Sequence, residues 1–144
     1  MIIENRRAGY EYFITDRFSA GIVLTGSEIK SIRAGKANIT DGYCSFHNEE
    51  LFLRNVHISE WKFASINNHE PVHDRKLLLK KTELKKLLNK TQEKGYTIVP
   101  IKIFFSEKGL AKLEIALAKG KKLYDKRDDL KLKDAKREID RRGE

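Results

Sequence analysis

The chain has 144 residues, of which 30 are Lys or Arg and 21 are Asp or Glu, so its formal net charge is +9 and its sequence pI is about 9.6. A chain of this length is one domain and buries roughly 70% of its unfolded surface on folding. Its single cysteine excludes an internal disulfide, and no stretch approaches the ~18 apolar residues of a membrane span. The N-terminus carries no apolar run of signal-peptide length. We expect a soluble cytoplasmic protein whose positive charge attracts nucleic acid or, as the second choice, an anionic membrane surface.

Apolar residues recur in strand-like runs through most of the chain. The predicted strands cover residues 10–14, 20–24, 43–46, 51–56, 96–105 and 110–117. Residues 47–50 separate two of these runs and are a hairpin signal, and Pro100 indicates an edge or a bulge in the fifth run. Six short strands with turn signals favour an antiparallel sandwich or a small barrel.

Two helices interrupt the predicted strands. Thr25 and Glu28 have the T-x-x-E spacing of a capping box, and Gly35 is a natural helix stop. A second helix is predicted from Thr82 to Gly95, with leucines at helical spacing and lysines on the other positions. The sequence therefore predicts a mainly β protein: a small closed antiparallel six-stranded barrel, OB-like, with two or three short helices and a basic C-terminal tail. Such barrels recurrently bind single-stranded or irregular nucleic acid.

Composition changes abruptly near Lys119, because residues 119–144 contain 11 basic and 7 acidic residues and few apolar ones. Lys133, Arg137 and Arg141 recur at helical spacing, but without a core-facing stripe most of the stability of a helix is missing. We therefore predict an RNA-binding barrel at 1–118 and a tail at 119–144 that is disordered alone and helical when docked on an anionic partner. The alternatives are a solvated helix or plain disorder.

Several segments together resemble the SmpB family, and they occur in the order found in that family. They are NRRAGYEY at 5–12, AGIVLTGSEIKSIRAGKANITDGY at 20–43, HIS at 57–59, NHEPVHDRKLLL at 68–79, LAKGKKLYDKR at 117–127 and DAKREIDRR at 134–142. The chain departs from the family at Glu60 and Trp61, where members usually have Pro-Tyr, and at His73, where they usually have Arg. A weaker base at His73 puts the RNA contact of that position in doubt.

The resemblance implies an RNA-binding adaptor. Members of the family bind the tRNA-like domain of transfer-messenger RNA and deliver it, with EF-Tu and GTP, to ribosomes stalled on truncated messages. The tail enters the empty mRNA channel near the decoding centre and contacts rRNA. The resemblance further implies a monomer that needs no cofactor or metal, makes and breaks no bond, and has no membrane partner.

Candidate contacts to transfer-messenger RNA combine basic side chains that suit phosphates with Asn and His side chains that suit base edges or 2′-hydroxyl groups. Each candidate also has a simpler interpretation, in which it lies on a solvated face, in a frayed terminus or in a surface loop. For Glu28 the simpler interpretation is a helix cap. The candidates are Asn5, Arg6, Arg7, Glu28, Lys30, Arg33, Gly35, Lys36, Asn68, His69, Arg75, Lys76 and Lys112.

Candidate ribosome contacts lie in the tail. The resemblance implies that the ring of Tyr124 stacks on a base. It also implies that Gly120 is a flexible joint between the barrel and the tail. The alternative is a basic tail that raises general RNA affinity. The candidates are Lys119, Gly120, Lys121, Lys122, Tyr124, Asp125, Lys126, Arg127, Lys133, Arg137 and Arg141.

Other functions fit the sequence less well. A nuclease would need His57, His69 or His73 in one pocket with Glu28 or Glu70, and no known catalytic spacing is present. Zinc would need more than two histidines four residues apart and one cysteine. A general RNA-binding module or a tail that docks on acidic proteins shares the charge, but predicts little preference for one RNA.

Overall fold

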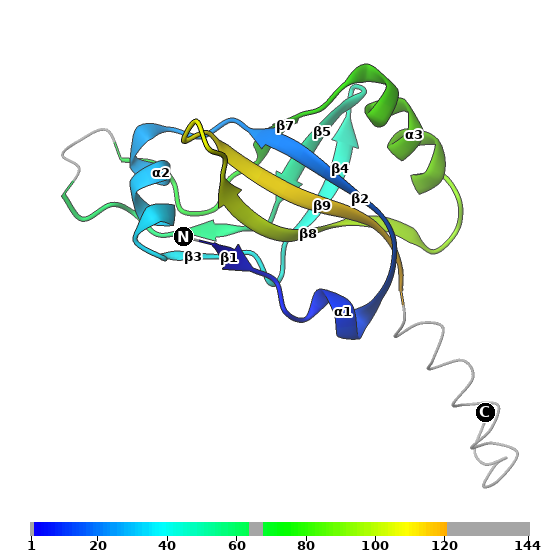
Figure 1. Ribbon diagram of the computed structural model, residues 1–144, viewed down its shortest axis with the longest axis horizontal. Coiled ribbons are helices and arrows are strands. Elements are labelled where there is room, and N and C mark those ends of the chain that lie inside the picture. The colour runs from blue at the N-terminus through cyan, green and yellow to red at the C-terminus, as the bar shows by residue number, and fades with distance from the viewer. Residues whose placement is uncertain (1, 64–67, 121–144) are drawn as a thin grey trace, which may run out of the picture.

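The computed structural model describes residues 2–63 and 68–120. Its centre is a ring of six antiparallel strands in the order β8-β4-β5-β7-β2-β9, closed by a second pairing of β9 with β8 (Figure 1). These strands are β2 (Tyr12–Ile22), β4 (Tyr43–His47), β5 (Glu50–Arg54), β7 (Arg75–Leu78), β8 (Tyr96–Phe105) and β9 (Ala111–Gly120). The predicted closed, antiparallel, six-stranded barrel is confirmed.

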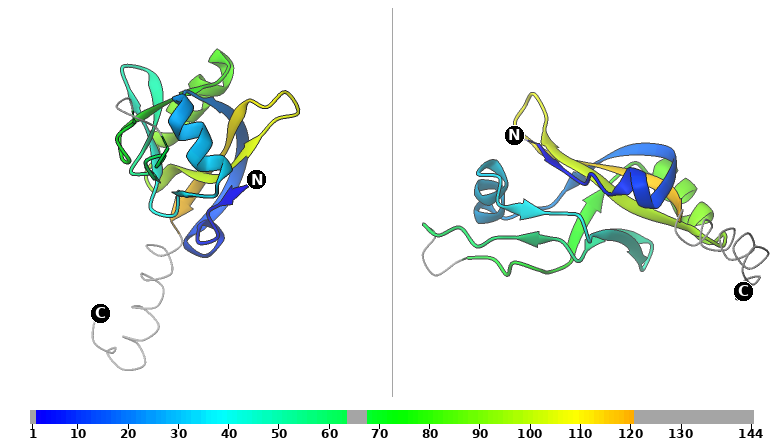
Figure 2. Two further views of the ribbon diagram at one scale, coloured as in Figure 1. Left: turned by 90° about the vertical axis from the view of Figure 1, so that its left-hand side faces the viewer. Right: turned by 90° about the horizontal axis from the view of Figure 1, so that it is seen from below.

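Short strands and helices surround the ring. β1 pairs with β8, and β3 pairs with β6 as a separate two-stranded ribbon. Two of the helices, α2 and α3, lie at opposite ends of the barrel (Figures 1 and 2). The surrounding elements are β1 (Ile3–Glu4), α1 (Ala8–Glu11), α2 (Gly26–Arg33), β3 (Ala37–Asn38), β6 (His57–Ile58) and α3 (Lys81–Thr91).

The ring has six strands as predicted, but its members differ from the prediction. The predicted strands at 10–14 and 20–24 are wrong as separate elements, because β2 is one strand of 11 residues and Tyr10 belongs to α1. β2 stays continuous because β9 pairs with it from Tyr12 to Gly21, with one irregularity between Ile14 and Asp16. The sixth place in the ring is taken by β7, which the sequence did not predict.

The β4–β5 turn and the β8–β9 pairing show two local features of the strands. The β4–β5 turn is tighter than the predicted 47–50 loop, because only Asn48 and Glu49 lie outside the ladder, with φ of 51° and 66°. Two consecutive residues with positive φ are the signature of a type I′ hairpin turn, whose twist matches that of the strands. Of the edge or bulge predicted at Pro100, the structure has the bulge, because the β8–β9 register shifts between Pro100 and Lys102.

The two longer helices close the core. Thr25 caps α2 and forms the predicted capping box with Glu28, and Gly35 follows the helix with a φ of 75°. α3 ends at Thr91, so its predicted extension to Gly95 is wrong. Ile32 from α2 and Leu87 from α3 are fully buried against strand residues that include Leu51, Leu53, Ile98, Ile103, Leu113 and Ile115.

The last strand extends past the predicted domain boundary. Lys119 pairs with Phe13, and Gly120 pairs with Tyr12, so both residues belong to β9 and not to the tail. The barrel therefore runs two residues further than 1–118. The remaining tail candidates and the predicted tail helix lie outside the described residues. No helix of the described part is long and apolar enough to cross a membrane.

Candidate nucleic-acid interface

A buried ion pair connects α2 to the start of β7. Nε of Arg75 donates to Oε2 of Glu28 at 2.7 Å, and neither side chain is more than 1% exposed. The same guanidinium donates to the backbone oxygens of Val56 (2.9 Å), Pro71 (3.1 Å) and His73 (3.3 Å). Arg75 is thus enclosed by protein acceptors, and its role is to hold the loop before β7.

Glu28 is the acceptor at the centre of this cluster. Its Oε1 accepts the backbone N–H of Thr25 at 2.9 Å, while Nε2 of His73 lies 2.7 Å from Oε2. Burial alone would raise the pKa of Glu28, but the hydrogen bonds from Thr25, Arg75 and His73 outweigh it and hold the pKa below its ordinary value. The carboxylate is therefore ionised at neutral pH and fully engaged within the protein.

Asn68 and His69 hold the loop after β6 in the same way. The Asn68 amide donates to the Trp61 carbonyl oxygen at 2.9 Å and accepts the Trp61 N–H at 3.2 Å. His69 is buried, with its two ring nitrogens 2.8 Å from Oγ of Ser27 and 2.9 Å from the carbonyl oxygen of Ile58. Both side chains shape the loop rather than project from it.

The N-terminal arm divides into a buried and an exposed part. Asn5 is 8% exposed, and its amide donates to the carbonyl oxygen of Pro100 at 2.9 Å, which fastens the arm to β8. Arg6 and Arg7 are exposed. Arg7 forms an ion pair with Glu11 at 3.1 Å on the first turn of α1. The two arginines form only surface ion pairs and are exposed enough to reach a large partner, whereas Asn5 is not.

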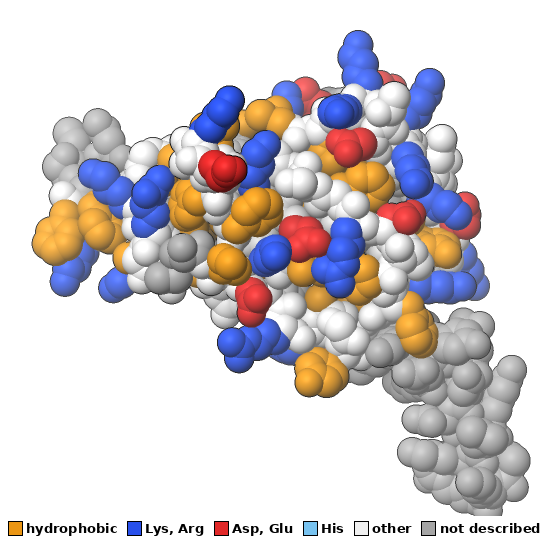
Figure 3. Space-filling view, in the orientation of Figure 1, with side chains coloured by type: hydrophobic (Ala, Val, Ile, Leu, Met, Phe, Trp, Pro, Cys, Tyr) orange, Lys and Arg blue, Asp and Glu red, His pale blue; other side chains and the backbone are white. Residues whose placement is uncertain are grey.

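Basic side chains cover the surface around α2. Lys30, Arg33 and Lys36 are exposed, and the Arg33 guanidinium lies 4.6 Å from the centre of the Phe105 ring. Figure 3 shows Lys and Arg side chains on the end of the molecule that carries α2 and also on the opposite end. Lys76, paired with Glu50 at 2.8 Å, and Lys112 on β9 are half-buried on other strands. These accessible cations suit phosphate contacts.

The sequence did not predict one aromatic surface of the molecule. Trp61 and Phe63 form an edge-to-face pair with ring centres 5.4 Å apart, next to Lys62 and close to Lys36. The aromatic-Lys-aromatic order of residues 61–63 is the signal in the sequence that marks this surface.

The rival metal site does not assemble. Within residues 2–63 and 68–120, no three His, Cys, Asp or Glu side chains form a group that could hold a metal ion. Cys44 is buried in the core, where burial raises the pKa of its thiol far above the ordinary value. His69 and His73 also point to different partners, Ser27 and Glu28.

Comparison with known proteins decides between the remaining readings. Residues 2–144 match the family described as SmpB protein. The chain belongs to the SmpB family. It is 57% identical to the SsrA-binding protein of Flavobacterium psychrophilum, over 96% of this chain and 93% of that one. The SsrA-binding protein of Symbiobacterium thermophilum is 50% identical, over 97% and 89% of the two chains.

The fold agrees with a solved member of the same family. A chain from the structure described as "tmRNA-SmpB: a journey to the center of the bacterial ribosome" superposes with a TM-score of 0.74. It is 46% identical, and the match covers 92% of each chain. Family and fold therefore agree over most of the chain.

Proposed function

We propose that this chain is an RNA-binding adaptor that binds the tRNA-like domain of transfer-messenger RNA and delivers it, with EF-Tu and GTP, to stalled ribosomes. The observation that carries the proposal is the family match over residues 2–144, together with 57% identity to an SsrA-binding protein over 96% of the chain. It acts in the cytoplasm as a monomer and makes and breaks no bond.

The proposed interface has two kinds of residue. Exposed cations around α2 and on the N-terminal arm contact phosphates, and they include Arg6, Arg7, Lys30, Arg33 and Lys36. Buried polar residues act behind them by fixing the backbone. They are Asn5, Glu28, His69 and Arg75. Asn68 likewise fixes the loop through the backbone of Trp61, and Gly35, Lys76 and Lys112 complete the proposed RNA contacts.

The tail has a separate proposed task on the ribosome. Residues 121–144 carry 10 basic and 7 acidic residues. They enter the empty mRNA channel, where Lys133, Arg137 and Arg141 grip rRNA phosphates from one helical stripe and Tyr124 stacks on a base. Recognition of transfer-messenger RNA belongs to the barrel.

Binding to the tRNA-like domain, compared with binding to a tRNA of equal length at about 150 mM salt, tests the proposal. The full chain and a chain ending at Gly120 are compared, because Gly120 is the last residue of β9. We expect both chains to prefer the tRNA-like domain. Equal affinity for the two RNAs would reject the adaptor and favour a general RNA-binding module.

A third chain separates the tasks of barrel and tail. In it, residues 121–144 are scrambled at constant composition, so the charge is kept and the order is lost. It should bind the tRNA-like domain as the natural chain does and fail in tagging on stalled ribosomes. Selectivity that disappears with the tail would show that the tail, and not the barrel, recognises the RNA.

A further inference from the structure

The chain leaves β6 and presents an aromatic pair at the α2 end of the molecule. Phe63 is 72% exposed, and its ring stands edge-to-face with Trp61, with an interplanar angle of 68°. Figures 1 and 2 show this segment projecting beyond the barrel next to α2. Exposed aromatic surface of this size is unfavourable in water and marks a surface that a partner covers.

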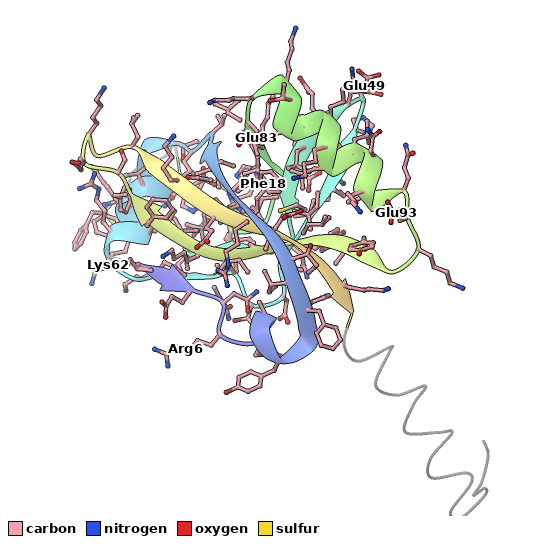
Figure 4. All side chains as sticks on the ribbon, turned by 45° about the vertical axis from the view of Figure 1, so that its right-hand side comes forward. Arg6, Phe18, Glu49, Lys62, Glu83 and Glu93 are labelled. Carbon is pink, nitrogen blue, oxygen red and sulfur yellow. The ribbon has the colours of Figure 1, made fainter. Side chains whose placement is uncertain are left out.

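The pair forms one wall of a shallow cavity of about 230 Å³, lined by Ala34, Lys36 and residues 60–63. Its exposed surface is mostly apolar, and its charged residues are Lys36, Lys62 and Glu60. Nζ of Lys62 lies 5.1 Å from the centre of the Phe63 ring, and Figure 4 shows Lys62 at the edge of the molecule. Two lysines against one glutamate leave an excess of positive charge beside the apolar surface, which suits a flat group that carries phosphates.

The backbone under the pair is fixed on both sides. Asn68 holds both backbone polar groups of Trp61, as described above. Before the pair, the Ser59 N–H donates to the Lys36 carbonyl oxygen at 3.0 Å, and Oγ of Ser31 donates to the Ser59 carbonyl oxygen at 2.6 Å. The platform is therefore in place before any partner arrives, which lowers the ordering cost of binding.

We propose that Trp61 and Phe63 bind one unpaired base of the RNA, while Lys36 and Lys62 contact the phosphates on either side of it. An unpaired base offers the flat face that stacks on aromatic rings, whereas the paired bases of a duplex are stacked on one another. The net charge of +9 and the two lysines favour an anionic occupant over an acid-poor peptide.

The inference rests on the proposed function for the identity of the RNA and adds a contact with a single-stranded part of it. Continuity with the basic surface of α2 supports the placement, since Lys36 belongs to both. The role of Asn68 also becomes specific, because that side chain positions the stacking platform through Trp61.

The chain supplies its own probe, since Trp61 is its single tryptophan. The full chain is titrated with the tRNA-like domain and with a fully paired RNA duplex of equal length, while tryptophan fluorescence is followed. We expect saturable quenching by the tRNA-like domain, with the midpoint of independently measured binding, and little quenching by the duplex. Equal quenching by both RNAs would overturn base stacking.

Variants test whether the stacking contributes to affinity. Trp61→Ala should weaken binding of the tRNA-like domain about tenfold, whereas Trp61→Phe, which keeps a flat ring, should stay within about threefold of the natural chain. Lys62→Ala should weaken binding, and Lys81→Ala, at the other end of the barrel, is the matched control. Circular dichroism and urea unfolding establish that each variant is folded.

The outcomes separate this inference from the proposed function. Selective binding of the tRNA-like domain with unchanged Trp61 emission, and natural affinity in Trp61→Ala, would overturn the inference and leave the adaptor intact. If the preference for that RNA is lost, a hexauridylate titration still decides whether Trp61 stacks on unpaired bases. Emission that changes only when a protein of the delivery complex is added would assign the surface to that protein and overturn the inference.

Discussion

Glu28 illustrates how far a single residue can be interpreted from its local sequence. The T-x-x-E spacing predicted a helix cap, and the cap is present. The spacing could not predict that the other carboxylate oxygen meets Arg75, 47 residues later, because that contact depends on how β7 is placed in the ring. The same placement turns Arg75 from an expected phosphate ligand into a buried support of the loop.

Replacing the Glu28 carboxylate by an amide should reduce stability in a pH-dependent way. At pH 7, Glu28→Gln leaves the buried Arg75 without a counter-charge, and we expect a loss of about 3 kcal/mol in the free energy of unfolding. Because the pKa of Glu28 is lowered by folding, its contribution is present above about pH 4.5 and disappears as pH falls through the folded-state value. The difference from the natural chain should therefore shrink between pH 7 and pH 3.5 in urea unfolding.

Glu50→Gln provides the matched control for Glu28. Glu50 also pairs with a cation, Lys76, at 2.8 Å, but both side chains are about half exposed. A surface pair of this kind contributes roughly 0–1 kcal/mol. A Glu28→Gln effect as small as the control, or one that does not change with pH, would contradict the assignment of Glu28 as the ionised centre of the cluster.

At the scale of elements, prediction succeeded where local chemistry determines the structure. The capped helix at Thr25 and the bulge at Pro100 each follow from residues close together in sequence. β7 was missed because it has four residues, and its partners β5 and β2 pair with it from distant parts of the chain. α1 is a single turn, too short for a helical repeat of apolar residues.

The β4–β5 hairpin offers a test at this scale. Glu49 has a φ of 66°, a conformation that costs a side chain about 1–2 kcal/mol and glycine almost nothing. Glycine loses roughly 0.5–1 kcal/mol through its greater freedom in the unfolded chain. Glu49→Gly should therefore raise the free energy of unfolding by about 0.5 kcal/mol, measured by urea unfolding. Gly109→Ala, at a φ of 81°, should lower it, and the same sign for both variants would contradict the turn assignment.

For the whole molecule, the sequence predicted the closed barrel and the composition change, but not the residue at which the barrel ends. Charge density rises at Lys119, whereas backbone pairing continues to Gly120, because strand pairing engages backbone groups whatever the side chain. The structure shows the basic candidates around α2 to be exposed, as a phosphate contact requires, whereas it shows Glu28, His69 and Arg75 to be buried, which the sequence did not predict. The exposure of most cations follows from their charge alone, whereas the partners of a buried polar group depend on how distant parts of the chain are placed by the fold.

The ring predicts where the chain can be cut. A chain ending at Gly120 keeps every described pair of β9 with β2 and β8, so its free energy of unfolding should stay within about 1 kcal/mol of the full chain. A chain ending at Ala116 loses Leu117 and Ala118, which are buried and face both neighbouring strands. By analogy with removal of one buried leucine side chain, we expect a loss of at least about 3 kcal/mol.

Urea unfolding of the full chain and of the chains ending at Gly120 and Ala116 measures both effects. Binding of the tRNA-like domain is measured on the chain ending at Gly120. Stability retained at Gly120 together with undiminished binding of the tRNA-like domain would mean that the barrel folds and recognises RNA without residues 121–144. A large loss of stability at Gly120 would instead mean that these residues pack on the barrel, and a tail that must leave the barrel to enter the ribosome would then pay for that contact each time it docks.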